Sequence, residues 1–225
     1  MLLALDSSTE ACSVALINGD EVTEQFLLTP REHTQRLLPM VDEVLAEAGI
    51  SLTQLDAIAY GRGPGSFTGL RICLGAVQGL AFGADLPVVP VSSLVALAQT
   101  ALDKGAVNTE QSVLAALDAR MDEVYWAHCH FQQGLAVIAG GEHLSAPEQV
   151  SLETINKDTL GVGSGWHYSA RISLEKIQSI HNDVLPSAGS VAKLGLNHFS
   201  KGEFCQADQA VPVYLRDEVA WQKQS

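Results

Sequence analysis

The chain has 225 residues, of which 47% are hydrophobic, with 13 Lys and Arg against 26 Asp and Glu. The formal net charge of −13 argues against a protein that grips nucleic-acid backbone directly, because such binding needs clustered Lys and Arg. Only 17% of the residues are charged, which is typical of a protein that another chain partly covers. The length suits one large domain or two small ones.

The cysteines and the N-terminus point to a cytoplasmic protein. Cys12, Cys73, Cys129 and Cys205 lie far apart without a C-x-x-C pair, which favours buried reduced thiols over disulfides or a zinc site. The first residues carry no basic segment and reach Asp6 at once, so no signal peptide is expected. No uninterrupted apolar run reaches membrane-spanning length, and no membrane contact is expected.

Predicted strands and helices alternate along the chain as in an α/β protein. Strand patterns fall at residues 2–5, 12–17, 21–28, 55–60, 86–91, 113–117, 124–131, 135–139 and 160–162. Helical patterns fall at residues 31–48, 69–82, 92–102, 147–155 and 187–199. Asn18-Gly19 is a hairpin signal, and Gly49 is a fitting helix C-cap.

The two halves of the chain begin alike. In each, a strand is followed by a polar turn that contains an aspartate, Asp6 or Asp118, and then by another strand. This repetition indicates an internal duplication. The polar, glycine-bearing stretch at 104–111 separates the halves. We therefore expect two lobes, residues 1–104 and 105–225, with the C-terminal tail packing back on the first lobe.

Glycines mark two neighbouring features. Residues 61–69 (GRGPGSFTG) join a predicted strand to a helix, where they could present backbone N–H groups to an anion or simply form a tight turn. In the helix that follows, Gly75, Gly79 and Gly83 recur every four residues, although each glycine costs about 1 kcal/mol relative to alanine. A row of glycines predicts close approach of another backbone, either a partner's helix or this chain's own sheet.

Four motifs together resemble the TsaB (YeaZ) family: Asp6-Ser7-Ser8-Thr9, residues 61–71, Asp118-Ala119-Arg120 with Glu123-Val124-Tyr125, and Pro212-Val213-Tyr214-Leu215-Arg216. The resemblance runs nearly the full length of the chain, and the glycine-proline loop is its most specific part. It implies an actin-like ATPase (ASKHA) fold of two related lobes, each with a mixed sheet and flanking helices. It also implies a place in bacterial tRNA threonylcarbamoyladenosine biosynthesis.

The resemblance further implies a division of labour. In that system the related TsaD subunit moves a threonylcarbamoyl group onto an adenosine beside the anticodon, and the TsaE ATPase joins the complex. A TsaB-like chain binds TsaD lobe to lobe, pairs with itself when alone, and meets tRNA only indirectly. The expected function is that of a cytoplasmic accessory subunit without catalytic residues of its own.

The two apolar helices of the first half are the predicted docking surface. Obligate interfaces bury apolar surface, and a helix with almost no polar face favours a partner over solvent. The residues expected to contact the partner are His33, Leu37, Val41, Val44, Arg71, Leu74, Gly75 and Gly79.

The alternative function is a nucleotide-dependent enzyme acting through Asp6 and the glycine loops. ATPases of the actin-like fold use an Asp-x-Gly-Thr/Ser turn, and this chain has Ser8 in the glycine position. Asp6 could still hold a hydrated cation, while Ser7, Ser8 and Thr9 could donate hydrogen bonds, which leaves open weak adenine nucleotide binding at the partner interface. Capping of a hairpin turn is favoured, because no lysine lies near this turn to neutralise phosphate.

No metal site is expected. The resemblance places the H-x-x-x-H metal motif of the catalytic relative at residues 90–97, which contain no histidine. His128 and His130 share one side of a strand, but no third ligand lies near them in sequence. Ser66 does not sit in a G-x-S-x-G elbow, so the sequence gives a serine hydrolase no support.

Overall fold

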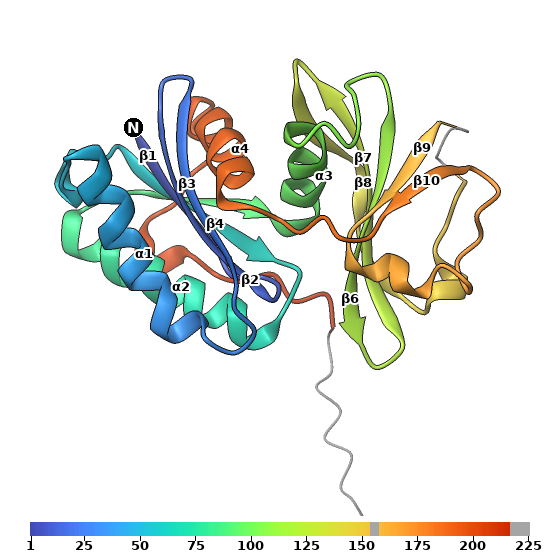
Figure 1. The fold of residues 1–225 in the computed structure, drawn as a ribbon. Helices are drawn as coiled ribbons and strands as arrows, with labels where there is room; N and C mark the ends of the chain where they lie inside the picture. The colour runs from blue at the N-terminus through green and yellow to red at the C-terminus, as the bar shows by residue number, and fades with distance from the viewer. Residues whose placement is uncertain (154–157, 217–225) are drawn as a thin grey trace, which may run out of the picture.

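The computed structural model describes residues 1–153 and 158–216, which form two lobes, each built on a five-stranded sheet (Figure 1). The first sheet contains β1 (Leu2–Asp6), β2 (Ala11–Asn18), β3 (Glu21–Leu28), β4 (Ala57–Gly63) and β5 (Val88–Ser92). The second sheet contains β6 (Ser112–Arg120), β7 (Glu123–Gln132), β8 (Leu135–Ser145), β9 (Thr159–Val162) and β10 (Ile177–His181).

The two sheets repeat one topology. Their strand orders are β3-β2-β1-β4-β5 and β10-β9-β6-β7-β8, so the first strand of each lobe is central and the fifth lies at an edge. In both lobes the first three strands form an antiparallel meander, and the fourth and fifth strands add in parallel. This duplication confirms the predicted fold class of two related lobes with mixed sheets.

Within the described residues, four α-helices cover the sheets: α1 (His33–Ala48), α2 (Phe67–Ala84), α3 (Ser93–Asp103) and α4 (Ala188–Ser200). In Figure 1, α1 and α2 lie on the outer side of the first sheet, while α3 and α4 lie between the two sheets. Short 3-10 helices occur at Leu52–Gln54, Pro147–Gln149, Ser164–Tyr168 and Ala207–Gln209.

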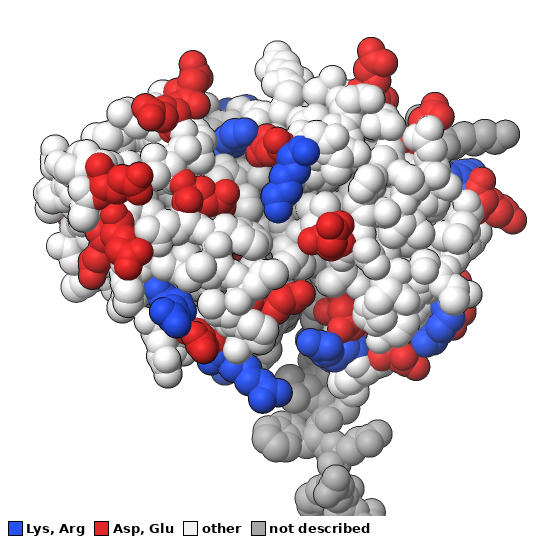
Figure 2. All heavy atoms as spheres, in the orientation of Figure 1, with Lys and Arg blue, Asp and Glu red and all other residues white. Residues whose placement is uncertain are grey.

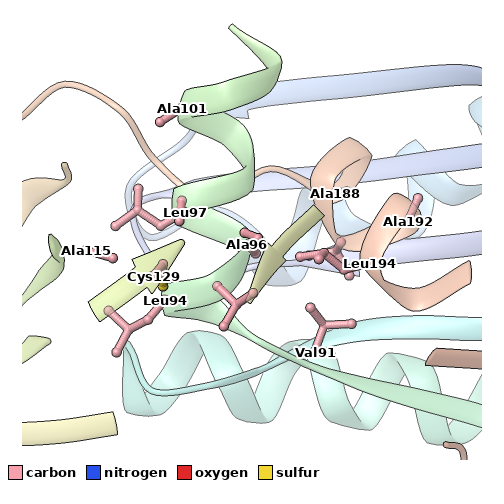
Figure 3. Packing of buried hydrophobic residues seen from close by; sticks show 14 of the residues in the cluster. Val91, Leu94, Ala96, Leu97, Ala101, Ala115, Cys129, Ala188, Ala192 and Leu194 are labelled. Carbon is pink, nitrogen blue, oxygen red and sulfur yellow. The ribbon is translucent and has the colours of Figure 1, made fainter. Parts of the chain in front are cut away.

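The helices between the lobes are exchanged. Helix α3 follows the last strand of the first sheet, yet it packs mainly on the second sheet, whereas α4 follows the second sheet and packs on the first. Leu94 and Leu97 of α3 share one buried cluster with Leu194 of α4 (Figure 3). The predicted lobe boundary at residue 104 separates the strands of the two sheets, but α3 and α4 each pack on the sheet of the other lobe. The boundary therefore stays a prediction.

Two predicted elements differ from the structure, and one strand was not predicted. The helix expected at 147–155 is a 3-10 turn at Pro147–Gln149, and residues 154–157 lie outside the described part of the chain. Strand β8 continues to Ser145 instead of ending at residue 139. Strand β10 was missed because it is a short edge strand with exposed polar residues, so its sequence shows no apolar alternation.

The inner face of α1 forms the core of the first lobe. Leu37, Val41 and Val44 are at most 1% exposed and belong to a cluster with the side chains of β1 and β2. The prediction that these three residues contact a partner is therefore wrong. An apolar stripe at helical spacing is what a helix needs to cover its own sheet, and it cannot be told from a docking stripe by periodicity.

We expect Leu37→Ala to lower the free energy of unfolding by about 2–5 kcal/mol, because it leaves a cavity beneath α1. The adjacent Leu38 is 48% exposed, so Leu38→Ala should change that free energy by less than about 0.5 kcal/mol. Urea unfolding followed by circular dichroism measures both variants. Equal losses would contradict the placement of Leu37 in the core.

Candidate functional site

A cleft of about 780 Å³ lies between the lobes. Its first wall is the turn after β1 together with the start of α2, represented by Thr9 and Ser66. Its second wall is the β6–β7 hairpin, represented by Asp118 and Arg120. The two motifs recognised at the ends of the first strands therefore face each other across this cleft, as the duplicated topology requires.

Two of the cleft's cations are already paired with acids. Arg120 lies 2.9 Å from Asp118 within the hairpin. Arg216 forms an ion pair with Glu123. Pairing lowers the positive potential that these guanidinium groups could offer to an anionic ligand.

The glycine loop packs backbone to backbone against the turn after β1. The Ser66 amide donates to the Ser8 carbonyl over 2.7 Å, and the Ser7 hydroxyl donates to the Gly69 carbonyl over 2.9 Å. A Cβ at Gly65 would lie 2.3 Å from the Ser8 carbonyl oxygen, and one at Gly69 would lie 1.9 Å from that of Ser7. These glycines thus serve contact within the chain, which favours the tight-turn interpretation of the loop.

Asp6 is enclosed by this junction. It is 1% exposed, and its Oδ1 accepts hydrogen bonds from the Ser8 amide (3.0 Å) and hydroxyl (2.8 Å). A Cβ at Gly61 would lie 1.8 Å from Oδ2, so glycine makes room for this carboxylate. Burial raises the pKa of Asp6 to about 6, against the opposing effect of the Ser8 hydrogen bonds.

The predicted nucleotide residues are mostly inaccessible. Asp6, Ser7 and Ser8 are each at most 1% exposed, and only Thr9 is partly exposed. A buried side chain can touch a ligand only if the glycine loop moves away. In the structure these residues hold the loop in place, and nucleotide binding through them stays a prediction.

His33 also belongs to this junction. Its side chain is buried, and its Nε2 lies 2.9 Å from the Thr9 carbonyl oxygen. The imidazole thus ties the first turn of α1 to the turn after β1. Contact between His33 and a partner stays a prediction, while within its own lobe the side chain is already hydrogen-bonded.

The outer face of α2 stays open. At Gly75, Gly79 and Gly83 nothing lies within 4 Å of the position that a Cβ would take. The interpretation in which the glycine row receives this chain's own sheet is therefore wrong. The helix packs on its core through three other buried residues, Cys73, Val77 and Ala81.

Helix α2 is apolar on its open side as well. It is long and apolar enough to cross a membrane by those two criteria, which the core helix of a soluble protein also satisfies. Only 28% of its residues are buried, however, so most residues of this apolar helix keep part of their surface exposed. Phe82, near its end, is 84% exposed.

The remaining predicted contact residues lie on or beside this face. Arg71 is exposed, donates from Nε to the Tyr214 hydroxyl over 3.1 Å, and lies 3.8 Å from the Phe67 ring centre. Leu74 is half-buried. Arg71, Leu74, Gly75 and Gly79 therefore stay predicted contacts. Arg62 instead pairs with Glu142 of the second lobe over 3.0 Å.

The sequence predicts that the C-terminal tail packs back on the first lobe, but it does not indicate that the tail also reaches the second lobe. Tyr214 reaches α2, and Arg216 reaches Glu123 and the carbonyl of Ala119 in the second lobe. The motif at residues 212–216 was the available signal, but it carried no spatial information. Only the fold reveals that these residues connect the two lobes.

The two strand histidines have local partners. The Nε2 of His128 lies 3.0 Å from the Ser151 carbonyl oxygen, and His130 pairs with Gln132 over 2.9 Å. Within residues 1–153 and 158–216, no three His, Cys, Asp or Glu side chains are grouped so that they could hold a metal ion.

We expect the chain to lose stability as pH rises from about 4 to about 6. In that range folded Asp6 still binds its proton, whereas an unfolded aspartate with a pKa of 3.8 has lost it, so rising pH favours unfolding. The loss should be on the order of 3 kcal/mol, and Asp6→Asn should abolish it. Urea unfolding at several pH values measures the slope. Asp20→Asn, in the exposed β2–β3 turn, is the matched control and should retain the slope of the wild type.

Comparison with known proteins places this fold in a family. A family model described as TsaD, tRNA N6-adenosine threonylcarbamoyltransferase, matches residues 27–223. The chain is 45% identical to the tRNA threonylcarbamoyladenosine biosynthesis protein TsaB of Escherichia coli (strain K12), over 99% of this chain and 97% of that protein. It is 43% identical to the protein of the same name from Haemophilus influenzae, over 99% and 96%. The solved structure of YeaZ from Pseudomonas aeruginosa matches with a TM-score of 0.90 at 47% identity, covering 95% of this chain and 99% of that one. The chain therefore belongs to the TsaB (YeaZ) family.

Proposed function

We propose that this chain is a non-catalytic subunit in tRNA threonylcarbamoyladenosine biosynthesis, which binds a TsaD transferase in a complex that the TsaE ATPase joins. The observation that carries the proposal is the open glycine row of α2. Membership in the TsaB family supports a role in this pathway. The burial of Asp6, Ser7 and Ser8 favours an accessory role over a catalytic one.

The glycine row lowers the stability of the free chain without any packing in return. Each glycine in a helix interior costs about 1 kcal/mol relative to alanine. At Gly75, Gly79 and Gly83 no neighbouring atom would obstruct a side chain, so the fold itself does not require glycine there. A smooth helix surface allows a second helix to approach closely. Exposed Leu38 and Phe82 add apolar area to the same pair of outer helices.

The comparisons favour TsaD as the occupant of this surface. The family model described as TsaD covers residues 27–223 of this chain, a range that includes both α1 and α2. Proteins that share a fold have helices in equivalent places, so two such lobes can meet through equivalent surfaces about a pseudo-two-fold axis. In the absence of TsaD, the same surface would pair with a second copy of this chain, because an exposed apolar patch favours any complementary cover.

The charge distribution favours contact with tRNA through another subunit. The net charge is −13, and in Figure 2 the Lys and Arg side chains of this face are interspersed with Asp and Glu. Affinity for the tRNA backbone needs several cations acting together. Contact with tRNA through the partner is therefore the arrangement that the chemistry favours.

We expect Gly79→Leu to weaken binding of TsaD from the same genome at least tenfold, because the leucine side chain occupies the space for the partner's helix. The free energy of unfolding of the isolated chain should stay unchanged or rise by up to about 1 kcal/mol, since leucine is the better helix former. Gly75→Leu should behave alike. Isothermal titration calorimetry and urea unfolding measure the two quantities.

Ser200→Leu is the matched control, because it adds the same side chain to an exposed position at the end of α4. It should leave the affinity for TsaD unchanged. Full affinity in both glycine variants would rule out α2 as the docking surface. The alternative function, a nucleotide-dependent enzyme, is tested by titrating the lone chain with ATP and Mg²⁺. Tight binding with turnover of the nucleotide would support that alternative.

A further inference from the structure

We infer that residues 205–216, here called the strap, couple docking on α2 to the angle between the two lobes. The identity of the partner rests on the proposed function, whereas the effect of the strap on the lobes does not. The strap is the last described segment of the chain, and it contacts both walls of the interlobe cleft.

The body of the strap is fixed to the first lobe. Cys205 exchanges two backbone hydrogen bonds with Val88 of β5 (2.9 and 3.0 Å). Further along, the Ala210 carbonyl accepts from Gln78 Nε2 of α2 over 3.1 Å, and the Val213 amide donates to the Arg62 carbonyl of β4 over 2.7 Å. These bonds, spread over nine residues, hold the strap against β5, α2 and β4.

The strap then reaches the docking helix through three side chains, Phe67, Arg71 and Tyr214. The Phe67 and Tyr214 rings lie 5.4 Å apart, and Arg71 contacts both of them. Phe67, Arg71 and Gly75 stand four residues apart, so they share one face of α2. All three are exposed, as is Tyr214, so a partner helix on the glycine row would contact this group as well.

The end of the strap contacts the second lobe through Arg216. The Arg216 guanidinium donates to the Glu123 carboxylate and to the Ala119 carbonyl (3.4 Å), and it lies against the Met121 sulfur (3.1 Å). Between these contacts the residues of the hairpin turn, 120–122, have φ angles of 61°, 54° and 63°. Residues other than glycine rarely adopt such positive φ angles, and this backbone conformation persists only where neighbouring groups stabilise it.

The consequence is a mechanical path from the docking face to the second lobe. A partner that packs on Phe67 and Tyr214 restrains the strap, and the restrained strap places Arg216 against the hairpin. Because coupling is reciprocal, a lobe angle that suits Arg216 also strengthens partner binding. A second interlobe link, between Arg62 and Glu142, lies in β4 and β8, away from the docking helix.

Hydrogen exchange of the full chain, with and without TsaD, tests this coupling. In the wild type, TsaD should slow amide exchange in α2 and also at residues 119–124 of the second lobe, the latter at least fivefold. In Arg216→Ala the protection of α2 should remain, the protection at 119–124 should be lost, and the affinity for TsaD should fall about threefold to tenfold.

Arg171→Ala is the matched control. Arg171 also contacts the hairpin, through Asp122 at 3.1 Å, but from within the second lobe. This variant should retain both the transmitted protection and the affinity. Transmitted protection in Arg216→Ala, or its absence in the wild type while α2 is protected, would overturn the coupling.

The free chain separates this inference from the proposed function. Without TsaD, Arg216→Ala should speed exchange at residues 211–214 of the strap, and Arg171→Ala should not. If TsaD fails to bind the wild type, the proposed function fails, and this comparison alone decides whether Arg216 anchors the strap. Equal amide exchange at residues 211–214 in the two variants would then refute the inference that Arg216 anchors the strap.

Discussion

The exchange of α3 and α4 between the sheets is the constraint on which the other features depend. Each helix follows one sheet and covers the other, so the buried interlobe cluster belongs to both lobes at once. The hydroxyls of Thr100 and Ser190 meet within this contact at 2.9 Å, and Lys193 pairs with Asp103 at its edge over 2.7 Å. The lobes are therefore joined by a shared core at their inner faces, which leaves the outer helices α1 and α2 free to face outward.

Glycine serves two opposite purposes within residues 61–83. At Gly61, Gly65 and Gly69 an added Cβ would collide with the turn after β1, so the fold requires these glycines. At Gly75 and the glycines that follow it every four residues, an added Cβ would meet nothing. The first group holds Asp6 in an enclosed junction, and the second presents bare backbone to the surroundings. This contrast, more than any single contact, separates the glycines that the fold requires from those that it leaves open at the surface.

Much of the fold could be predicted from the sequence, but which helix faces are buried and which are exposed could not. The opening meander and helices α1 to α4 could be predicted because apolar periodicity and turn residues are local signals. The roles of Leu37 and of the glycine row could not, since a buried stripe and a docking stripe have the same period. Likewise, the tail motif identified Tyr214 and Arg216 without showing that they meet α2 and the second lobe. Such contacts join residues about 90 to 150 positions apart, and only the assembled lobes bring them together.

The exchange of helices also determines the order in which the chain can complete itself during synthesis. The first sheet is finished once β5 has emerged from the ribosome, but the helix that covers its inner face comes roughly a hundred residues later, at Ala188–Ser200. Throughout that interval an apolar sheet surface is exposed to other nascent chains, which makes such a species prone to aggregation. A ribosome that pauses between β6 and α4 therefore holds a half-protected lobe, and we expect this to be the stage at which chaperones engage the protein.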